Sequence, residues 1–365
     1  MPPVSHHDIH GRSQGDAPVP LSVLDLLPIG AGQSAADAVR ANVALARLAE
    51  SRGYHRLWIA EHHNSPAMAG SSPAVLLAHL AAHTSTLRLG SGGIMLPNFA
   101  PLVVAEQFGT LNALIPGRVD LGVGRAFGTS KGAAAALRRD GRPQEGNDFP
   151  TQVDELIRYL DGEVPDVWRD VDARAVPGPH RPGGGPGQRP PLWILGSSVG
   201  SARMAATLGL PYAYAHHIAP EDTRECLAAY RESFLASDWL TRPYVAVALT
   251  AFAAEDRRRA LAQLLTGALA TLWWQRGRLE PLPTPEEAAA HPLTDEDKSA
   301  LAAALRDAVF GAPEEVRAGI DAFVDDTGAD EVLLTSLVHG TDARLRSYEL
   351  IADAYGFPKE REETR

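Results

Sequence analysis

The sequence contains little cysteine, no long apolar run and a deficit of positive charge. Cys226 is the one cysteine among 365 residues, which excludes an intrachain disulfide framework and a cysteine-based metal cluster. It lies in a helical pattern with no histidine or lysine nearby to activate it, which favours a structural thiol. The 34 Lys and Arg residues against 45 Asp and Glu give a net charge of -11. A general nucleic-acid binder would need a basic face, so the sequence predicts no nucleic-acid partner.

The absence of long apolar runs also indicates where in the cell the protein is expected. No stretch approaches the roughly 20 uncharged residues of a membrane span, and the N-terminal region lacks the apolar core of a signal peptide. We therefore expect a cytoplasmic protein without a membrane partner. Residues 1–20 show no hydrophobic periodicity and predict a flexible N-terminal tail. In that tail His6, His7 and His10 fit a solvated segment better than a metal-binding tract.

Short apolar runs alternate with amphipathic stretches from Leu21 onward, which is typical of βα units around a parallel sheet. Eight runs are predicted as strands: Leu21–Leu27, Arg56–Ala60, Arg88–Leu96, Val119–Val123, Leu192–Leu195, Tyr212–Ala215, Tyr244–Ala253 and Glu331–Thr335. Eight alternations favour a closed (β/α)8 TIM barrel over an open sheet, and the length fits about 250 barrel residues plus insertions. We predict an α/β fold with one domain over residues 21–357 and a C-terminal tail over 358–365.

Helices are predicted between the strands. Ala35–Arg52 has apolar residues at helical spacing and is followed by Gly53 as a stop. Pro73, Pro101 and Pro150 each stand where a first helical turn tolerates a missing N–H.

Two connections are longer than a barrel requires. Pro177–Pro191 holds five Gly and six Pro in fifteen residues and predicts an irregular surface loop before the fifth strand. The connection between the seventh and eighth strands carries predicted helices around Ala260–Trp274 and Glu296–Val309, with the proline-rich segment Gly277–Pro292 between them. That segment is interpreted either as a lid over the catalytic face or as a helical elaboration packed outside the barrel.

Several strand ends carry side chains that are able to do chemistry. Glu61-His62-His63 follows the second strand, Gly124-Arg125 the fourth and His216-His217 the sixth. The C-terminal ends of barrel strands meet at one face, and imidazole titrates near neutrality, so either histidine pair could move protons or steady a developing negative charge. A single histidine of this kind is more often structural.

A metal-dependent hydrolase also uses His and Glu at barrel strand ends. Such a site needs more ligands than this chain offers, because the first strand ends in Leu27-Pro28-Ile29-Gly30 without a His-x-His pair. The eighth strand likewise ends without a carboxylate. We therefore predict no metal.

Three glycine-rich segments bear on whether the protein binds a cofactor. Gly122–Gly128 is a weak match to a dinucleotide fingerprint, because its spacing and position are wrong. Gly196–Ser201 directly follows a strand and precedes a helix, so its backbone N–H groups and the helix dipole can hold a phosphate, with Arg125 nearby. An ordinary serine-capped helix is the alternative for this segment. In the third strand, Gly90–Pro97, the glycines are typical of a close approach by a flat, bulky group.

In this order, these segments resemble the bacterial-luciferase-like family of flavin-dependent monooxygenases. The resemblance covers roughly residues 21–355, and the Glu-His-His motif with the glycine-rich third strand carries most of it. It implies a TIM barrel that binds reduced FMN at its C-terminal face, in a dimer of barrels. Luciferase carries a reactive cysteine where this chain has Gly124, so light emission is not expected.

The resemblance also assigns residues. His62 matches the family's catalytic histidine, and the strand-six pair would assist it, with His216 as the second predicted catalytic residue. A non-proline cis peptide beneath the flavin matches Gly92-Gly93. The predicted phosphate-side residues are Arg125, Ser197, Ser198, Val199, Gly200 and Ser201.

The implied function is a two-component monooxygenase. A separate flavin reductase would supply FMNH2, O2 would form a C4a-hydroperoxyflavin, and a small organic substrate would be epoxidised or hydroxylated. A polyketide intermediate is the leading substrate hypothesis, because the Ala-, Arg- and Pro-rich composition suggests a GC-rich actinobacterial genome. An F420-dependent hydride-transferring oxidoreductase on the same barrel, and a catalytically idle flavin-binding protein, are the alternatives.

Overall fold

The computed structural model describes residues 9–11, 13–126, 128, 131–137, 148–178 and 189–358. The predictions for His6 and His7, for the middle of the Pro177–Pro191 loop and for the C-terminal tail beyond residue 358 lie outside these residues.

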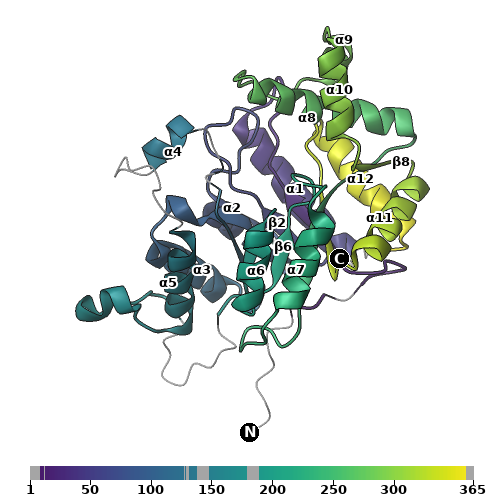
Figure 1. Ribbon diagram of the computed structural model, residues 1–365. Helices are drawn as coiled ribbons and strands as arrows, with labels where there is room; N and C mark the ends of the chain where they lie inside the picture. Colours follow the sequence, from purple (N-terminus) through teal and green to yellow (C-terminus); the bar gives the residue numbers. More distant parts are fainter. Residues whose placement is uncertain are drawn as a thin grey trace, which may run out of the picture.

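A closed, all-parallel barrel of eight strands forms the centre of the molecule (Figure 1). Its strands are β1 (Leu21–Asp25), β2 (Arg56–Ile59), β3 (Arg88–Met95), β4 (Val119–Gly124), β5 (Leu192–Gly196), β6 (Tyr212–Tyr214), β7 (Val245–Ala253) and β9 (Glu331–Thr335). They pair in the order β1 to β7 and then β9, which pairs back with β1, so the barrel closes. The predicted TIM barrel and its eight strands are confirmed.

Helices surround the barrel (Figure 1). They are α1 (Ala35–Arg52), α2 (Pro73–Ala81), α3 (Pro101–Leu114), α4 (Lys131–Leu137), α5 (Phe149–Asp161), α6 (Val199–Thr207), α7 (Thr223–Ser233), α8 (Arg257–Gln275), α9 (Pro285–Ala290), α10 (Asp295–Ala304), α11 (Pro313–Thr327) and α12 (Thr341–Ala354), with 3-10 turns η1 (Leu96–Asn98) and η2 (Asp166–Val171).

Local sequence signals set the helix ends. Ser34 caps α1 by accepting a hydrogen bond from the backbone of Asp37, and Gly53 ends it at φ 80°. Pro73 and Pro101 begin α2 and α3 as predicted, because the first turn has no partner for the missing N–H.

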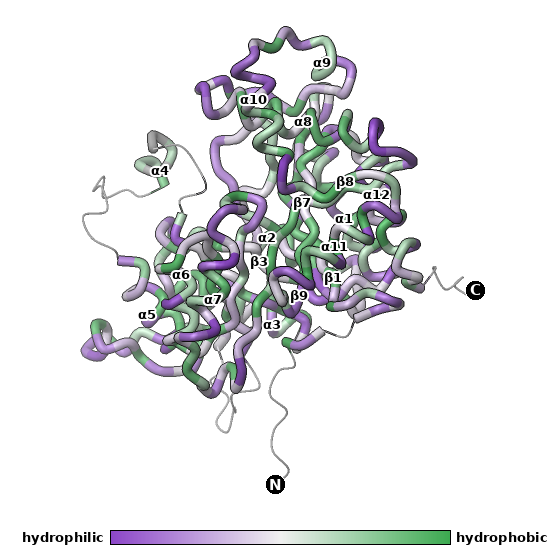
Figure 2. The backbone as a smooth tube through the Cα atoms, turned by 45° about the vertical axis from the view of Figure 1, so that its right-hand side comes forward, coloured by the Kyte–Doolittle hydropathy of each residue, from purple (hydrophilic) through white to green (hydrophobic). Residues whose placement is uncertain are grey.

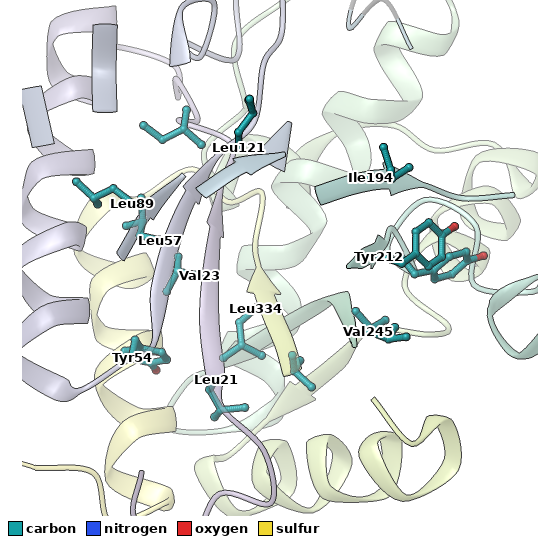
Figure 3. Packing of buried hydrophobic residues seen from close by; sticks show 14 of the residues in the cluster. Leu21, Val23, Tyr54, Leu57, Leu89, Leu121, Ile194, Tyr212, Val245 and Leu334 are labelled. Atoms are coloured by element: carbon teal, nitrogen blue, oxygen red, sulfur yellow. The ribbon is translucent and has the colours of Figure 1, made fainter. Parts of the chain in front are cut away.

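Side chains along each strand point alternately outward and inward, and this divides the hydrophobic core into two layers. Residues such as Leu21, Val23, Leu57 and Leu89 face outward and pack between strands and helices (Figure 3). The residues between them point into the barrel, where the indole rings of Trp58 and Trp193 meet edge to face at 5.0 Å. Since neighbouring residues of a strand point to opposite sides, one apolar strand supplies both layers.

A buried cluster of charges fills the N-terminal end of the barrel. Arg56 donates to Asp120 at 2.8 Å and to both oxygens of Glu331 at 2.8 and 3.0 Å, and all three side chains are fully buried. Arg88 pairs with the second oxygen of Asp120. Burial alone would raise the pKa of Asp120, but Arg56 and Arg88 outweigh it and hold that pKa at about 2. Two cations and two carboxylates leave this cluster neutral.

Part of the N-terminal region packs against this cluster. Ile9 is 4% exposed, and its carbonyl oxygen accepts a hydrogen bond from Arg56 at 2.7 Å. The ring of His10 meets Tyr244 edge to face. The predicted tail is therefore packed at Ile9 and His10, whereas Ser13, Gly15, Asp16 and Pro18 are exposed.

The connection between β7 and β9 forms an insertion at the top of the molecule, which contains α8, α9 and α10 (Figures 1 and 2). The predicted helix around Glu296–Val309 is shorter, because a short strand, β8 (Val309–Gly311), follows α10 and pairs with the end of β7. Within the proline-rich segment Gly277–Pro292, Leu282 is fully buried and exchanges backbone hydrogen bonds with Ile29 and Ala31. Those contacts favour the elaboration over the lid.

Candidate active site

A large cavity opens at the C-terminal ends of the barrel strands. Its volume is 1370 Å³. Pockets for drug-sized ligands usually measure about 300–1,000 Å³, so this cavity has room for a cofactor and a substrate together. No residue of 277–292, a segment described throughout, lines it; the insertion contributes instead through α8 and residues 303–308.

The strands supply the cavity wall through their inward-facing residues. They include Leu24 and Leu26 on and after β1, Trp58, Ala60 and His62 on and after β2, Ala248 and Thr250 on β7, and Leu333, Thr335 and Leu337 on and after β9. The spacing of two residues continues beyond the ends of β2 and β9, so it predicts which side chain of a strand-end motif enters the cavity.

His62 is the member of the Glu-His-His motif that lines the cavity. Burial, with a smaller contribution from the charge of His63, lowers the pKa of His62 to about 4, so its imidazole is neutral at pH 7. Its Nδ1 atom is buried and has no hydrogen-bond partner among the described residues. An orphaned polar atom in a cavity wall is a place for a ligand or a water.

The other two residues of the motif have a structural role. The carboxylate of Glu61 is fully buried and accepts hydrogen bonds from His63 Nε2 at 2.7 Å, from the Met95 backbone at 3.1 Å and from Asn98 at 3.3 Å. Glu61 therefore fixes the ends of β2 and β3 relative to each other and turns His63 away from His62.

The two histidines after β6 both line the cavity but have different hydrogen-bond partners. His217 is directed to β7, where both its backbone N–H and its Nδ1 atom contact the carbonyl oxygen of Ala248. Burial lowers the pKa of His217 to about 4, and the charges of His216 and His62 act in the same direction. Since β2 and β6 stand on opposite sides of the barrel, His62 and His217 face each other across the cavity.

His216, the second predicted catalytic residue, also lines the cavity. Its Nδ1 atom lies 2.7 Å from the Thr223 hydroxyl, and its ring packs edge to face on Phe323 at 4.8 Å. It touches the rim of the cavity beside Glu221 and Asp307, and burial lowers its pKa against the effect of those carboxylates. The sequence named both histidines as possible assistants of His62, and the structure places both along the cavity.

The N-terminus of α6 forms one end of the cavity. Ser197, Ser198, Gly200 and Ser201 line it, whereas Val199 does not. Ser198 caps the helix, and the Ser201 hydroxyl donates to the Ser198 carbonyl at 2.7 Å, so both hydroxyls serve the turn. What remains for a ligand is the first-turn backbone N–H groups and the positive end of the helix dipole.

Arg125 adds a positive charge to that end. It lines the cavity, is exposed, and forms no ion pair with any carboxylate that the structure describes. A Cβ at the neighbouring Gly124 would meet nothing nearer than the Met95 sulfur at 3.7 Å, and one at Gly200 nothing nearer than 3.9 Å. A ligand can therefore approach the backbone closely at both glycines, and this cradle fits a phosphate.

The glycine-rich third strand forms an adjoining wall. The peptide bond between Gly92 and Gly93 is cis, as predicted, and both residues line the cavity. The register with β4 shifts between Ser91 and Ile94. A Cβ at Gly92 would lie 2.6 Å from Leu24, so a side chain does not fit here. The wall is thus bare backbone, which suits a flat ring.

Within the described residues, no group of three or more His, Cys, Asp or Glu side chains is placed to hold a metal ion. In the same part of the chain, none of the helices combines the length and apolar character that crossing a membrane requires.

Fold and site together define a TIM-barrel enzyme. At the C-terminal ends of its strands, one cavity brings together a helix N-terminus with an arginine, a wall of glycine backbone and neutral histidines. A family model described as luciferase-like monooxygenase matches residues 19–331. The chain belongs to this family and is an oxygenase.

Individual relatives agree with this assignment. A luciferase-like monooxygenase of Escherichia coli (strain K12) is 42% identical over 339 residues, which cover 93% of this chain and 97% of the relative. The crystal structure of apo-MsnO8 superposes with a TM-score of 0.81 at 36% identity, covering 94% of this chain and 99% of that one. An N-acetyl-S-alkylcysteine monooxygenase of Bacillus subtilis (strain 168) is 42% identical over 214 residues, 59% of this chain and 61% of the relative.

The fold alone is compatible with two cofactors. The oxygenating constituent of 3,6-diketocamphane monooxygenase from Pseudomonas putida, in complex with FMN, shares the fold with a TM-score of 0.67 at 18% identity. An F420-dependent secondary alcohol dehydrogenase shares it with a TM-score of 0.63 at 15% identity.

Proposed function

We propose that this protein is the oxygenase component of a two-component system, which takes reduced FMN from a separate reductase and uses O2 to oxygenate a small organic substrate. The observation that carries the proposal is the cavity itself: a phosphate cradle, a bare glycine wall and a buried, unpartnered imidazole nitrogen line one space. A polyketide-like intermediate remains the proposed substrate, for epoxidation or hydroxylation.

Bound FMNH2 would supply two electrons and two protons and end as oxidised FMN, so that one atom of O2 enters the substrate and the other leaves as water. Arg125 and the first turn of α6 would hold the phosphate, since both are cationic or partly positive and face the cavity. Gly92 and Gly93 would carry the ring, because no side chain stands between it and the backbone.

His62 would act on the oxygen chemistry as a neutral group. With a pKa of about 4 it can donate or accept one hydrogen bond at pH 7 without carrying charge. We propose that it holds or passes a proton at the reacting oxygen, and that His217, rather than His216, assists from the opposite wall. The apolar residues around them would exclude water from the reaction.

The test is the reaction of the protein with FMNH2 and O2. The protein is mixed with FMNH2 without oxygen and then with aerated buffer, while the flavin absorbance spectrum is recorded. We expect slower reoxidation than for free FMNH2, and an acceleration when a substrate is added. Reoxidation at the rate of free flavin would contradict the proposal. Binding of reduced F420 with hydride transfer to an organic acceptor, unaffected by O2, would support the F420 alternative instead.

Replacing Arg125 with methionine should weaken FMN binding at least about tenfold. The reason is the loss of a charge-assisted contact to the phosphate in a site where no other described cation lines the same end. Quenching of FMN fluorescence measures the Kd. Riboflavin, which lacks the phosphate, is the matched control ligand and should bind the variant and the wild-type protein equally. An equal loss for riboflavin would place Arg125 outside the phosphate site.

We also propose that two copies associate through α2 and the adjacent α3. Val75 on α2 is 67% exposed, and Leu114 on α3 is 61% exposed. Because α2 has apolar residues on nearly all sides, we expect another protein surface to cover its exposed side. Sedimentation equilibrium should give twice 38.9 kDa for the wild-type chain and 38.9 kDa for Val75→Glu. A wild-type mass of one chain would refute the pairing.

A further inference from the structure

Two threonines form a polar pair on the cavity wall opposite the proposed flavin site. Thr250 on β7 and Thr335 on β9 are direct partners in the register of these neighbouring strands, and both line the cavity. In a parallel pair, partnered residues point to the same side, so both side chains face the cavity.

The hydroxyl of Thr335 lacks a partner. Thr335 is 2% exposed, and its Oγ1 atom makes no hydrogen bond to any residue that the structure describes. A buried hydroxyl without a hydrogen bond costs stability, and native proteins seldom keep one without a reason. A ligand group that enters the cavity would supply the missing partner.

The neighbours of Thr335 in the cavity wall are apolar. Along the chain the inward neighbours of Thr335 are Leu333 on β9 and Leu337 just after it. On β1, Val23 pairs with Leu334, so the inward-facing Leu24 comes beside Thr335. A charged group placed here would have no counter-ion, so the pair suits a neutral acceptor such as a carbonyl oxygen.

The position of the pair indicates which ligand it meets. In the closed order of eight strands, β7 stands four places from β3, and β9 stands four places from β4. The threonines therefore lie across the barrel from Gly92, Gly93 and Arg125. If the flavin ring lies against the glycine wall, the space between the ring and the threonines is left for the substrate.

We propose that Thr250 and Thr335 recognise the substrate, and that the substrate is a neutral, mainly apolar molecule with a carbonyl group that accepts hydrogen bonds from this pair. The inference rests on the proposed function for the position of the flavin. It makes these threonines specificity-determining residues, while His62 stays the residue at the reacting oxygen.

The experiment uses two probes with the same carbon skeleton, acetophenone and ethylbenzene, which differ by one carbonyl oxygen. Ligand-observed NMR titration of the FMN-loaded protein gives both Kd values. We expect acetophenone to bind about tenfold more tightly, as one or two added hydrogen bonds predict. Thr335→Val should remove this preference, and Thr335→Ser, which keeps the hydroxyl, should retain it.

Thr271→Val is the matched control. Thr271 on α8 also lines the cavity, but its hydroxyl already donates to the Gly267 carbonyl at 2.8 Å, so its loss should leave the acetophenone preference unchanged. Thr335→Val should also melt at the wild-type temperature or above it, because it removes an unpartnered hydroxyl. A fall of several degrees would reveal a structural partner and overturn the proposal.

Other outcomes separate this proposal from the proposed function. Equal binding of the two probes to the wild-type protein, or a preference that survives in Thr335→Val, overturns the threonine site. A higher Kd for FMN in Thr335→Val would mean that the pair holds the flavin, which also overturns it. If the protein does not bind FMN, the proposed function fails, and the probe comparison made without FMN still decides whether the threonines recognise a carbonyl.

Discussion

Replacing His62 with asparagine should abolish the delay in flavin reoxidation and lower any substrate oxygenation by at least about 100-fold. A positioned acid–base group contributes about 10²–10⁴ in rate, and the Nδ1 atom of His62 is the buried, unpartnered polar atom of the motif after β2. The Kd for FMN should change little, since the proposed phosphate and ring contacts belong to other residues. Stopped-flow absorbance and fluorescence quenching measure the two quantities.

The control for this variant is His63→Gln. The ring of His63 is directed to Glu61 at 2.7 Å, away from the cavity, so this variant should keep the delay. An unchanged delay in His62→Asn, or an equal loss in His63→Gln, would remove His62 from the oxygen chemistry.

The lowered pKa of His62 also has a consequence for stability. In the folded protein this pKa is about 4, whereas an exposed histidine titrates near 6.5. Between these values the unfolded chain binds a proton that the folded chain does not, so the free energy of unfolding falls as the pH drops from about 6.5 to 4. His55 and His217 also have lowered pKa values, so the free energy of unfolding of His62→Asn should still fall at acid pH. The fall should be smaller than in the wild-type protein by up to about 3 kcal/mol. Denaturant titrations at pH 7 and pH 4.5 measure this difference.

The largest effect on stability is expected for Arg56→Met. This change leaves Asp120 and Glu331 buried without the cation that contacts both, and breaking such a pair costs about 3–5 kcal/mol. A guanidinium titration should show this loss in the free energy of unfolding. The control is Arg169→Met, whose pair with Asp166 is 75% and 61% exposed and should change stability by less than about 1 kcal/mol. A similar small change for Arg56→Met would show that the buried charges tolerate separation.

The barrel was predictable because its strands are short apolar runs bounded by clear turn signals. The same reasoning extended a predicted helix to Val309, because a three-residue strand such as β8 has too few positions to show a period. The sequence also gave no indication that Ile9 is packed, since its partner, Arg56, lies 47 residues further along the chain.

The candidate site was predictable in its outline and less so in its details. His62, Arg125 and the turn before α6 carry recognisable motifs at strand ends. The sequence could not separate His216 from His217, because both line the cavity and they differ in their partners in the folded chain, the Thr223 hydroxyl for His216 and the Ala248 carbonyl for His217. Thr335 gave no signal, because a threonine in a strand is common and only its missing partner in the folded chain sets it apart.

The contact between Ile9 and Arg56 redefines where the folded unit begins. A chain cut at Leu21, the first residue of β1, would keep every strand of the barrel. It would lose the backbone oxygen that a buried guanidinium uses and the apolar side chain beneath the barrel floor. Limited proteolysis should therefore spare the peptide bonds immediately after Ile9, and shortened versions made for expression should keep the chain from about that residue onward.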